Sequence, residues 1–211
     1  MGKFIRFVRE LLLRHPLPSP IVNFVLMLRW RCYIHPFASI GYPNRVRFGK
    51  YCRIGKCKIS APRNQLSSSK YSIVIEDRAF LGDGVVLSSQ GGCIEIGANV
   101  SIHDYSIIYG YGGVRVGSDT RIAAASIIVS HEHVFQHKNI AIREVVCERR
   151  GVTVGRDCWL GVGCRVLGGI SIGDFAIVGA GAVVTSDISP ESISVGVPAK
   201  FMRNRFSPTA I

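Results

Sequence analysis

Three histidines stand close together in the segment SHEHVFQH, at positions 131, 133 and 137. Neutral imidazoles are good zinc ligands, so His131, His133 and His137 form one candidate metal site. An imidazole that titrates near neutral pH is also suited to general-base catalysis. In a third interpretation, all three are polar residues of a surface loop. The pattern of the surrounding sequence has to separate these alternatives.

The surrounding sequence follows a period of six residues. Aliphatic side chains recur at every sixth position toward the C-terminus: Val154, Leu160, Val166, Ile172, Val178 and Val184. The same spacing occurs upstream in shorter runs: Ile75, Leu81 and Leu87; Ile96, Ile102 and Ile108; Val116, Ile122 and Ile128. This period fits neither an amphipathic helix nor an alternating strand. It predicts short extended segments joined by sharp turns, three to a coil, stacked as a triangular prism of parallel strands.

The composition narrows the class of protein. The chain has 211 residues, of which 47% are hydrophobic and 19% are charged, which indicates a globular domain and not a disordered chain. The net charge of +12 suits an anionic partner: nucleic acid, a membrane surface or a phosphorylated small molecule. The seven cysteines are odd in number and lack a C-x-x-C pair, so we expect reduced thiols in a cytosolic protein without a cleavable signal.

Two stretches carry a resemblance to a known family. VTVGRDCWLGVGCRVLGGISIGDFAIVGAGAVVTSDI and the later GVPAKFMR resemble the left-handed β-helix, or hexapeptide-repeat, acyltransferases, and the likeness covers residues 34–203. Within that family, the chain is most similar to the sugar O-acetyltransferases that act on maltose, galactosides, nodulation factors and bacterial surface polysaccharides. The resemblance implies an all-β fold, a left-handed parallel β-helix with an N-terminal helical appendage and one long extruded loop.

The resemblance also implies an activity and an assembly. We expect a homotrimer that transfers an acetyl group from acetyl-CoA to a saccharide hydroxyl in bacterial surface polysaccharide or glycan biosynthesis. The acceptor sugar is expected to be free, nucleotide-linked or lipid-linked, and no nucleic acid partner is expected. Two alternatives remain open: N-acetylation of an amino sugar, and a metal-binding β-helix such as a gamma-type carbonic anhydrase.

The six-residue pattern is interrupted once. After Ile128 it resumes regularly only at Val154, so residues 129–152 are expected to leave the prism as a loop. A solenoid tolerates such an insertion because each coil contacts only its neighbours, and loops on a rigid scaffold commonly carry function.

The histidines fall at the start of this loop. In the resembling family the catalytic histidine follows a small residue there, which matches Ser130 and His131. His133 is the reserve candidate, and His137 is expected to have a structural or substrate-contacting role. In gamma-type carbonic anhydrases the metal ligands come from different coils, whereas these histidines share one loop, so no metal is expected. The prediction is that His131 is a general base.

The resemblance further implies where acetyl-CoA binds. The matching positions line a groove and hold the phosphates: Gly161, Gly179, Ala180, Thr185, Ser186, Lys200 and Arg203. The donor to the thioester oxygen matches Val162, where relatives often carry serine, so only its backbone N–H is available. Relatives often carry lysine at position 186. The alternative for the last two cations is a solvated basic tail.

Two further groups of residues have open interpretations. His103, Asp104 and Tyr109, in SIHDYSIIYGYGG, either line the acceptor pocket or are ordinary residues of the coil surface. Trp159 packs either over the cofactor groove or in the core.

The N-terminal segment forms a separate unit. We expect an appendage over residues 1–33 and the β-helix over 34–211, which ends in a basic tail. KFIRFVRELLLR places apolar residues on one helical face, and the apolar run IVNFVLML is too short to span a bilayer. The appendage either covers the open end of the prism or a neighbouring subunit, or lies on an anionic lipid surface. The expected location is the cytoplasm, at the inner face of the membrane in the second case.

Overall fold

The structure is a computed structural model that describes residues 19–62, 70–135 and 138–207. The helix expected in KFIRFVRELLLR, and His137, lie outside the described residues. Among the described helices, none combines the length and the apolar character that crossing a membrane requires.

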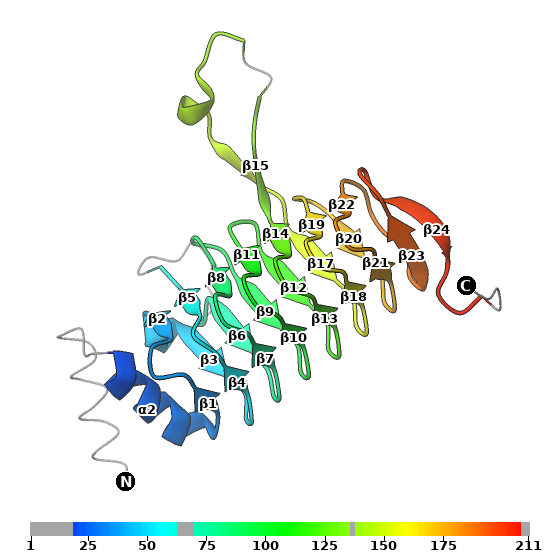
Figure 1. The fold of residues 1–211 in the computed structure, drawn as a ribbon. Helices are drawn as coiled ribbons and strands as arrows, with labels where there is room; N and C mark the ends of the chain where they lie inside the picture. Colours follow the sequence, from blue (N-terminus) through cyan, green and yellow to red (C-terminus); the bar gives the residue numbers. More distant parts are fainter. Residues whose placement is uncertain (1–18, 63–69, 136–137, 208–211) are drawn as a thin grey trace.

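Short strands form three sheets, which are the three faces of a prism (Figure 1). Sheet A contains β1 (Tyr33–Ile34), β4 (Arg53–Ile54), β7 (Phe80–Leu81), β10 (Ser101–Ile102), β13 (Arg121–Ile122), β18 (Trp159–Leu160), β21 (Ile177–Val178), β23 (Ser192–Val195) and β24 (Lys200–Asn204). Sheet B contains β2 (Ser39–Gly41), β5 (Lys58–Ser60), β8 (Val86–Ser88), β11 (Ile107–Tyr109), β14 (Ile127–Val129), β19 (Arg165–Val166) and β22 (Val183–Val184). Sheet C contains β3 (Val46–Phe48), β6 (Ile73–Ile75), β9 (Ile94–Ile96), β12 (Val114–Val116), β17 (Val152–Val154) and β20 (Ser171–Ile172).

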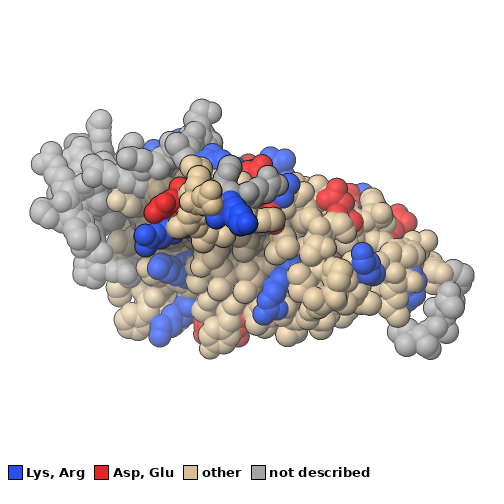
Figure 2. Space-filling view, turned by 90° about the horizontal axis from the view of Figure 1, so that it is seen from above, with Lys and Arg blue, Asp and Glu red and all other residues tan. Residues whose placement is uncertain are grey.

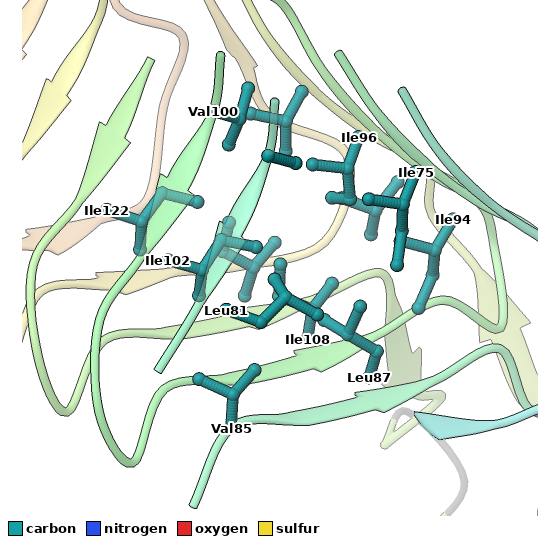
Figure 3. Close-up of a cluster of buried hydrophobic side chains, with 14 of the residues drawn as sticks. Ile75, Leu81, Val85, Leu87, Ile94, Ile96, Val100, Ile102, Ile108 and Ile122 are labelled. Carbon is teal, nitrogen blue, oxygen red and sulfur yellow. The ribbon is translucent and has the colours of Figure 1, made fainter. Parts of the chain in front are cut away.

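The six-residue period is the distance from one face to the next. Ile75, Leu81 and Leu87 lie in sheets C, A and B in turn, and all three are fully buried. Parallel register then stacks equivalent residues, so Ile102 pairs with Leu81 in the coil before it and with Ile122 in the coil after it. Figure 3 shows these side chains meeting in one interior. Each fully buried aliphatic side chain contributes about 1.5–3 kcal/mol, so the repeat itself builds the core. The predicted left-handed parallel β-helix is confirmed.

Glycines at the corners serve the close approach of successive coils. A Cβ on Gly155 would lie 2.6 Å from the amide nitrogen of Asp174 in the next coil. The left-handed backbone conformation of that corner falls instead on Asp157, with φ of 48°. Asparagine and aspartate tolerate this region better than most residues. The corner glycine is therefore required by stacking and not by its own dihedral angles.

The two ends of the prism are closed by different elements. At the N-terminal end, α2 (Ser19–Trp30) buries Val22 and Leu26 against the first coil. The side-chain amide of Asn23 fixes the helix by donating to three main-chain oxygens, those of His35 (2.9 Å), Pro36 (3.0 Å) and Ala38 (2.9 Å). At the C-terminal end, β24 turns back antiparallel to β23. Both elements cover strand edges that would otherwise be open to pairing with another chain.

The interruption of the repeat forms a projecting ribbon. β15 (His131–His133) leaves β14, pairs antiparallel with β16 (Cys147–Arg149), and the chain then re-enters the prism at β17. Figure 1 shows this ribbon standing away from the prism. A short 3-10 helix, η2 (Ile142–Glu144), lies near its tip, and a second one, η1 (Pro43–Arg45), lies in the first coil. The predicted extruded loop is present, and its base is a regular two-stranded sheet.

Candidate active site

The prism has three corners, each named here by the two sheets that it joins. The AB corner follows the strands of sheet A, the BC corner follows those of sheet B, and the CA corner follows those of sheet C. Because the coils are in register, residues at one corner form a column along the prism. The site residues that the sequence predicts fall on the AB and BC columns.

The ribbon leaves the prism at the BC corner and is held there by Ser130. This side chain is buried; its hydroxyl donates to the carbonyl oxygen of Tyr109 (2.8 Å) and accepts the N–H of Gly112 (3.0 Å). Across the ribbon, the N–H of Arg150 donates to the carbonyl oxygen of Ser130 (2.9 Å). A Cβ on Gly168, in the following coil, would lie 2.9 Å from the Cβ of Arg150. The ribbon base is therefore seated tightly between two coils, which fixes the residue after Ser130.

That residue is His131, which is half-buried. Its ring lies 5.9 Å from the ring of Tyr111 at 90°, and 6.4 Å from the ring of Tyr109. Nδ1 is buried and has no hydrogen-bond partner among the described residues. An unpaired buried polar atom costs about 1–3 kcal/mol, and such atoms in native structures call for a functional explanation. With Nδ1 enclosed by the coils, Nε2 is the ring nitrogen that can meet a substrate.

Tyr111 and Arg149 complete the surroundings of His131, and the sequence analysis missed both. Arg149 is paired with His131 across the ribbon, and its guanidinium lies 4.5 Å from the centre of the Tyr111 ring. β11 and β14 are in register with Tyr109 opposite Val129, so Tyr111 is one coil below His131. The only sequence signal for Tyr111 is its place in SIHDYSIIYGYGG, two residues after Tyr109. Arg149 could not be assigned from the sequence, because nothing in it shows which residues of the loop pair.

The opposite face of the ribbon carries an ion-pair cluster. Glu132 and Glu148 are directly opposite each other, a like-charge pair that would be unfavourable alone. Arg150 pairs with both, at 3.0 Å from Glu132 and 3.8 Å from Glu148. Exposed ion pairs of this kind contribute at most about 1 kcal/mol each. The cluster favours one orientation of the ribbon and keeps these carboxylates away from His131.

His133 lies further out on the ribbon and is exposed. Its imidazole nitrogens are 3.5 Å (Nδ1) and 3.4 Å (Nε2) from the sulfur of Cys147, which is opposite it. Over the described ranges, no group of three or more His, Cys, Asp or Glu side chains has the arrangement of a metal site. Burial raises the pKa of the Cys158 and Cys164 thiols, so these two sulfurs stay protonated and are poor nucleophiles.

Gly161, Val162, Gly179 and Ala180 come together at the AB corner. Gly161 is covered by the next coil, since a Cβ there would lie 2.5 Å from the amide nitrogen of Ala180. Val162 is 57% exposed, and no described acceptor takes its backbone N–H. Gly163 has open space where a Cβ would project. Small side chains therefore leave a strip of main chain uncovered, as a long, narrow ligand with amide groups requires.

The same corner differs in the earlier coils. There the carboxylate of Asp83 accepts the N–H of Lys56 (2.7 Å), and the carboxylate of Asp104 accepts the N–H of Asp83 (2.9 Å). The column continues through Ala124, Val162 and Ala180, which have no side chain able to cap the N–H of the coil before. The AB column thus changes from capped amides to free amides after Asp104.

The remaining predicted residues are divided between these corners. Thr185 and Ser186 follow β22 at the BC corner, and Ser186 and Lys200 line the same small cavity of about 120 Å³. Arg203 lies further along β24, half-buried, with its guanidinium donating to the carbonyl oxygen of Asn204 (3.2 Å).

The predicted acceptor residues do not form one group. Tyr109 is beside His131, whereas His103 and Asp104 are on the AB corner, where the His103 ring lies 5.6 Å from that of Phe80. Trp159 is exposed on the outer face of sheet A and is not a core residue. Sheet B separates His131 from the uncovered strip within one chain.

The geometry defines a class of protein: a β-helix of six-residue repeats with a histidine at the base of a projecting ribbon. The family model for bacterial transferase hexapeptide (six repeats) matches residues 151–186. WbbJ of Escherichia coli, named for O-acetyl transfer in lipopolysaccharide biosynthesis, is 30% identical over 207 residues, which covers 95% of this chain and 87% of WbbJ. This chain therefore belongs to the hexapeptide-repeat acyltransferases, as the sequence predicts.

Other relatives match a smaller part of the chain or match it at lower identity. Rv3034c of Mycobacterium tuberculosis, named as an acetyltransferase, is 30% identical over 125 residues, and the match covers 59% of this chain and 42% of Rv3034c. Among solved structures, a mutant of AntD, an N-acyltransferase from Bacillus cereus with a dTDP-amino sugar and coenzyme A, superposes with a TM-score of 0.60. It is 22% identical, and the match covers 81% of this chain and 86% of AntD. At this identity the likeness supports the fold alone.

Proposed function

We propose that this protein is an acetyl-CoA-dependent O-acetyltransferase that acts on a saccharide hydroxyl in the biosynthesis of a bacterial surface polysaccharide or a related glycan. The observation that carries the proposal is His131, held rigidly at the base of the ribbon with Nδ1 enclosed and Nε2 left for a substrate. The name of WbbJ supports O-acetylation of a saccharide. The exposed N–H of Val162 supports acyl transfer, because a thioester oxygen that becomes negative needs such a donor.

In the proposed reaction His131 is the general base. Nε2 removes the proton of the acceptor hydroxyl while that oxygen forms a bond to the acetyl carbonyl carbon. The carbon–sulfur bond of the thioester breaks, and His131 returns the proton to the departing sulfur. The main-chain N–H of Val162 stabilises the charge on the carbonyl oxygen. No covalent acyl-enzyme forms in this scheme.

Acetyl-CoA, as the acetyl donor, is proposed to lie along the AB corner. Val162 and Ala180 offer unpaired main-chain N–H groups for its pantetheine arm, and Gly161 and Gly179 are proposed to let the coils stack closely beneath it. At the C-terminal end of the prism the ligand is proposed to pass the cavity that Ser186 shares with Lys200, where Thr185 and Ser186 of the BC corner supply hydroxyl groups. Lys200 and Arg203 supply cations for its phosphates, since charge-assisted hydrogen bonds to phosphate are strong.

We propose a homotrimer in which the ribbon of one copy reaches the AB corner of the next. Within one chain sheet B separates His131 from that corner, so a second copy is needed to complete the site. The ribbon also exposes apolar side chains, with Phe135 78% exposed, as an uncovered interface would. Mixing His131→Ala subunits with Lys200→Ala/Arg203→Ala subunits should restore activity through shared sites, assayed at an acetyl-CoA concentration that is sufficient for the wild type and too low for the second variant alone. A monodisperse monomer in light scattering, or no restoration in mixed oligomers, would contradict this arrangement.

The acceptor is proposed to meet Tyr109 beside His131, with His103 and Asp104 approaching from the AB corner of a neighbouring copy. The sugar itself is free, nucleotide-linked or lipid-linked. A lipid-linked acceptor fits a cytoplasmic enzyme that makes peripheral contact with the inner face of the membrane through its N-terminal region, which we propose as its location.

A panel of saccharides tests the activity. Coenzyme A release with acetyl-CoA should require a saccharide acceptor, and the product should lose its acetyl group in mild alkali, as an ester does. An alkali-stable acetyl group would mean N-acetylation of an amino sugar. Metal bound stoichiometrically to the purified protein, with turnover abolished by EDTA, would favour the metal-dependent alternative.

A further inference from the structure

The N-terminal end of the prism carries the most one-sided charge in the molecule. Residues 19–62 contain no Asp or Glu, and they contain eight basic residues: Arg29, Arg31, Arg45, Arg47, Lys50, Arg53, Lys56 and Lys58. These eight set a local charge of +8 against +12 for the whole chain. Figure 2 shows several Lys and Arg side chains on the N-terminal half of the prism, in the view from above. Such a surface attracts anions over the range of the Debye length.

Part of this charge surrounds a depression next to the end of α2. The depression has a volume of about 290 Å³ and is lined by Arg29, Trp30, Arg31, Arg47, Lys50 and Asp77, among others. Arg47 pairs with Glu76 at 2.5 Å, and Asp77 accepts the main-chain N–H of Lys50 at 2.8 Å. Arg29 and Arg31 form no ion pair with any described residue. The Arg29 guanidinium lies 4.9 Å from the centre of the Trp30 ring. Since neither it nor the guanidinium of Arg31 has a described carboxylate partner, both can bind an external anion.

An apolar face adjoins the depression on the same helix. Ile21, Phe24 and Leu28 follow a spacing of three and four residues, so they share one side of α2, and Phe24 is 59% and Leu28 67% exposed. The opposite side of the helix is buried in the prism. Because Asn23 fixes the rotation of the helix through its three hydrogen bonds, this apolar side is held outward. Exposed apolar side chains beside arginines that form no ion pair make an amphipathic surface.

We propose that this surface docks on an anionic lipid bilayer. Ile21, Phe24 and Leu28 enter the boundary between headgroups and acyl chains, and Arg29 and Arg31 bind lipid phosphates at the depression. Charge complementarity with the cytoplasmic leaflet supports this occupant, and only a membrane offers an apolar layer directly beneath its phosphates. A nucleic acid would satisfy the arginines and leave the three apolar side chains in water. The inference rests on the membrane contact proposed above and specifies its surface and ligand class.

Co-sedimentation of the full chain with lipid vesicles tests the proposal. The protein should bind vesicles of phosphatidylcholine with phosphatidylglycerol, bind those of phosphatidylcholine alone far more weakly, and be released in part by high salt. Arg29→Glu/Arg31→Glu should weaken binding by at least about tenfold, because it reverses two charges near the anionic surface. Phe24→Ser/Leu28→Ser should also weaken binding by at least about tenfold, because it removes two large apolar side chains from the acyl boundary. Arg121→Glu/Arg165→Glu changes the net charge equally in the middle of the prism and should bind nearly as the wild type does.

Several outcomes would overturn it. Equal losses in both charge variants would mean diffuse attraction without a docking surface. Wild-type binding by Phe24→Ser/Leu28→Ser would mean that the apolar face of α2 does not enter the bilayer. A smaller mass of that variant in light scattering would assign the face to a second copy, and stronger binding of duplex DNA than of vesicles would assign it to nucleic acid.

Coenzyme A release with a soluble acceptor, measured in parallel, separates this result from the proposed function, since the α2 variants should keep that activity.

Discussion

The AB corner of the prism has two different halves, although the coils beneath it repeat the same core. In the N-terminal half, Asp83 and Asp104 each cap a main-chain N–H of the coil before. In the C-terminal half, Ala124, Val162 and Ala180 stand at the same positions and leave the amides free. The repeat therefore fixes the scaffold, whereas one side chain per coil decides whether the main-chain amides of a corner are capped or free to bind a ligand.

The largest expected effect is at the ribbon base. General-base catalysis typically contributes about 10²- to 10⁴-fold, so His131→Ala should lower kcat by that factor with acetyl-CoA affinity retained. Steady-state kinetics and calorimetry measure the two quantities. His133→Ala is the matched control and should change kcat far less; the reverse result would move the base to His133.

A single substitution should give the C-terminal half of the AB corner a capped amide like those of the N-terminal half. By analogy with Asp83 and Asp104, Ala180→Asp places a carboxylate where it can cap the N–H of Val162. Loss of one oxyanion donor costs about 10²- to 10³-fold in kcat, so a loss of about that size is expected with the melting temperature unchanged. Ala180→Ser is the control for size. Full activity of Ala180→Asp would show that the Val162 N–H has no part in the reaction.

The two cations proposed to hold the phosphates should affect the binding of acetyl-CoA more than the rate of turnover. Lys200→Ala and Arg203→Ala should each weaken acetyl-CoA binding by about 1–3 kcal/mol, because each removes a charge-assisted hydrogen bond to phosphate. Calorimetry at low and high salt provides the measurement, with dephospho-CoA as a second ligand. Unchanged affinity in the double variant would place the phosphates elsewhere and leave these residues as a solvated tail.

The smallest effect is expected from substitutions of Tyr111, whose ring packs against that of His131. Tyr111→Leu removes the ring that contacts both His131 and Arg149, so kcat should fall by about tenfold with the KM for acetyl-CoA unchanged, since misplacement of a catalytic group is costly. Tyr111→Phe keeps the ring and should restore the rate. Equal losses in both variants would point to a role of the hydroxyl group instead of a positioning role of the ring.

The fold could be read from the sequence because one property repeats. Ile75, Leu81 and Leu87 are each one face apart, and a period that fits neither helix nor alternating strand leaves few architectures. The extruded segment was visible as a break in that period. Its pairing was not, because the contact of His131 with Arg149 depends on a hairpin register that local spacing does not encode.

The sequence names candidate residues for the site but does not show where they lie relative to one another. His131 and Val162 could each be named from the family resemblance, but their placement at different corners follows from which sheet precedes each turn. The change in the AB column from Asp104 to Ala124 is also hidden in the sequence, because those residues become neighbours only through the register of β10 and β13.

The central claim is direct transfer of an acetyl group to a saccharide hydroxyl, and isotope-labelled acetyl-CoA with a working acceptor tests it most directly. Mass spectrometry should find one ester-linked labelled acetyl group on the saccharide for each coenzyme A released, and no label on the protein, also when the reaction is stopped before completion. Label trapped on the protein, for example on Cys147, would contradict direct transfer, and label found only in amide linkage would contradict the hydroxyl acceptor.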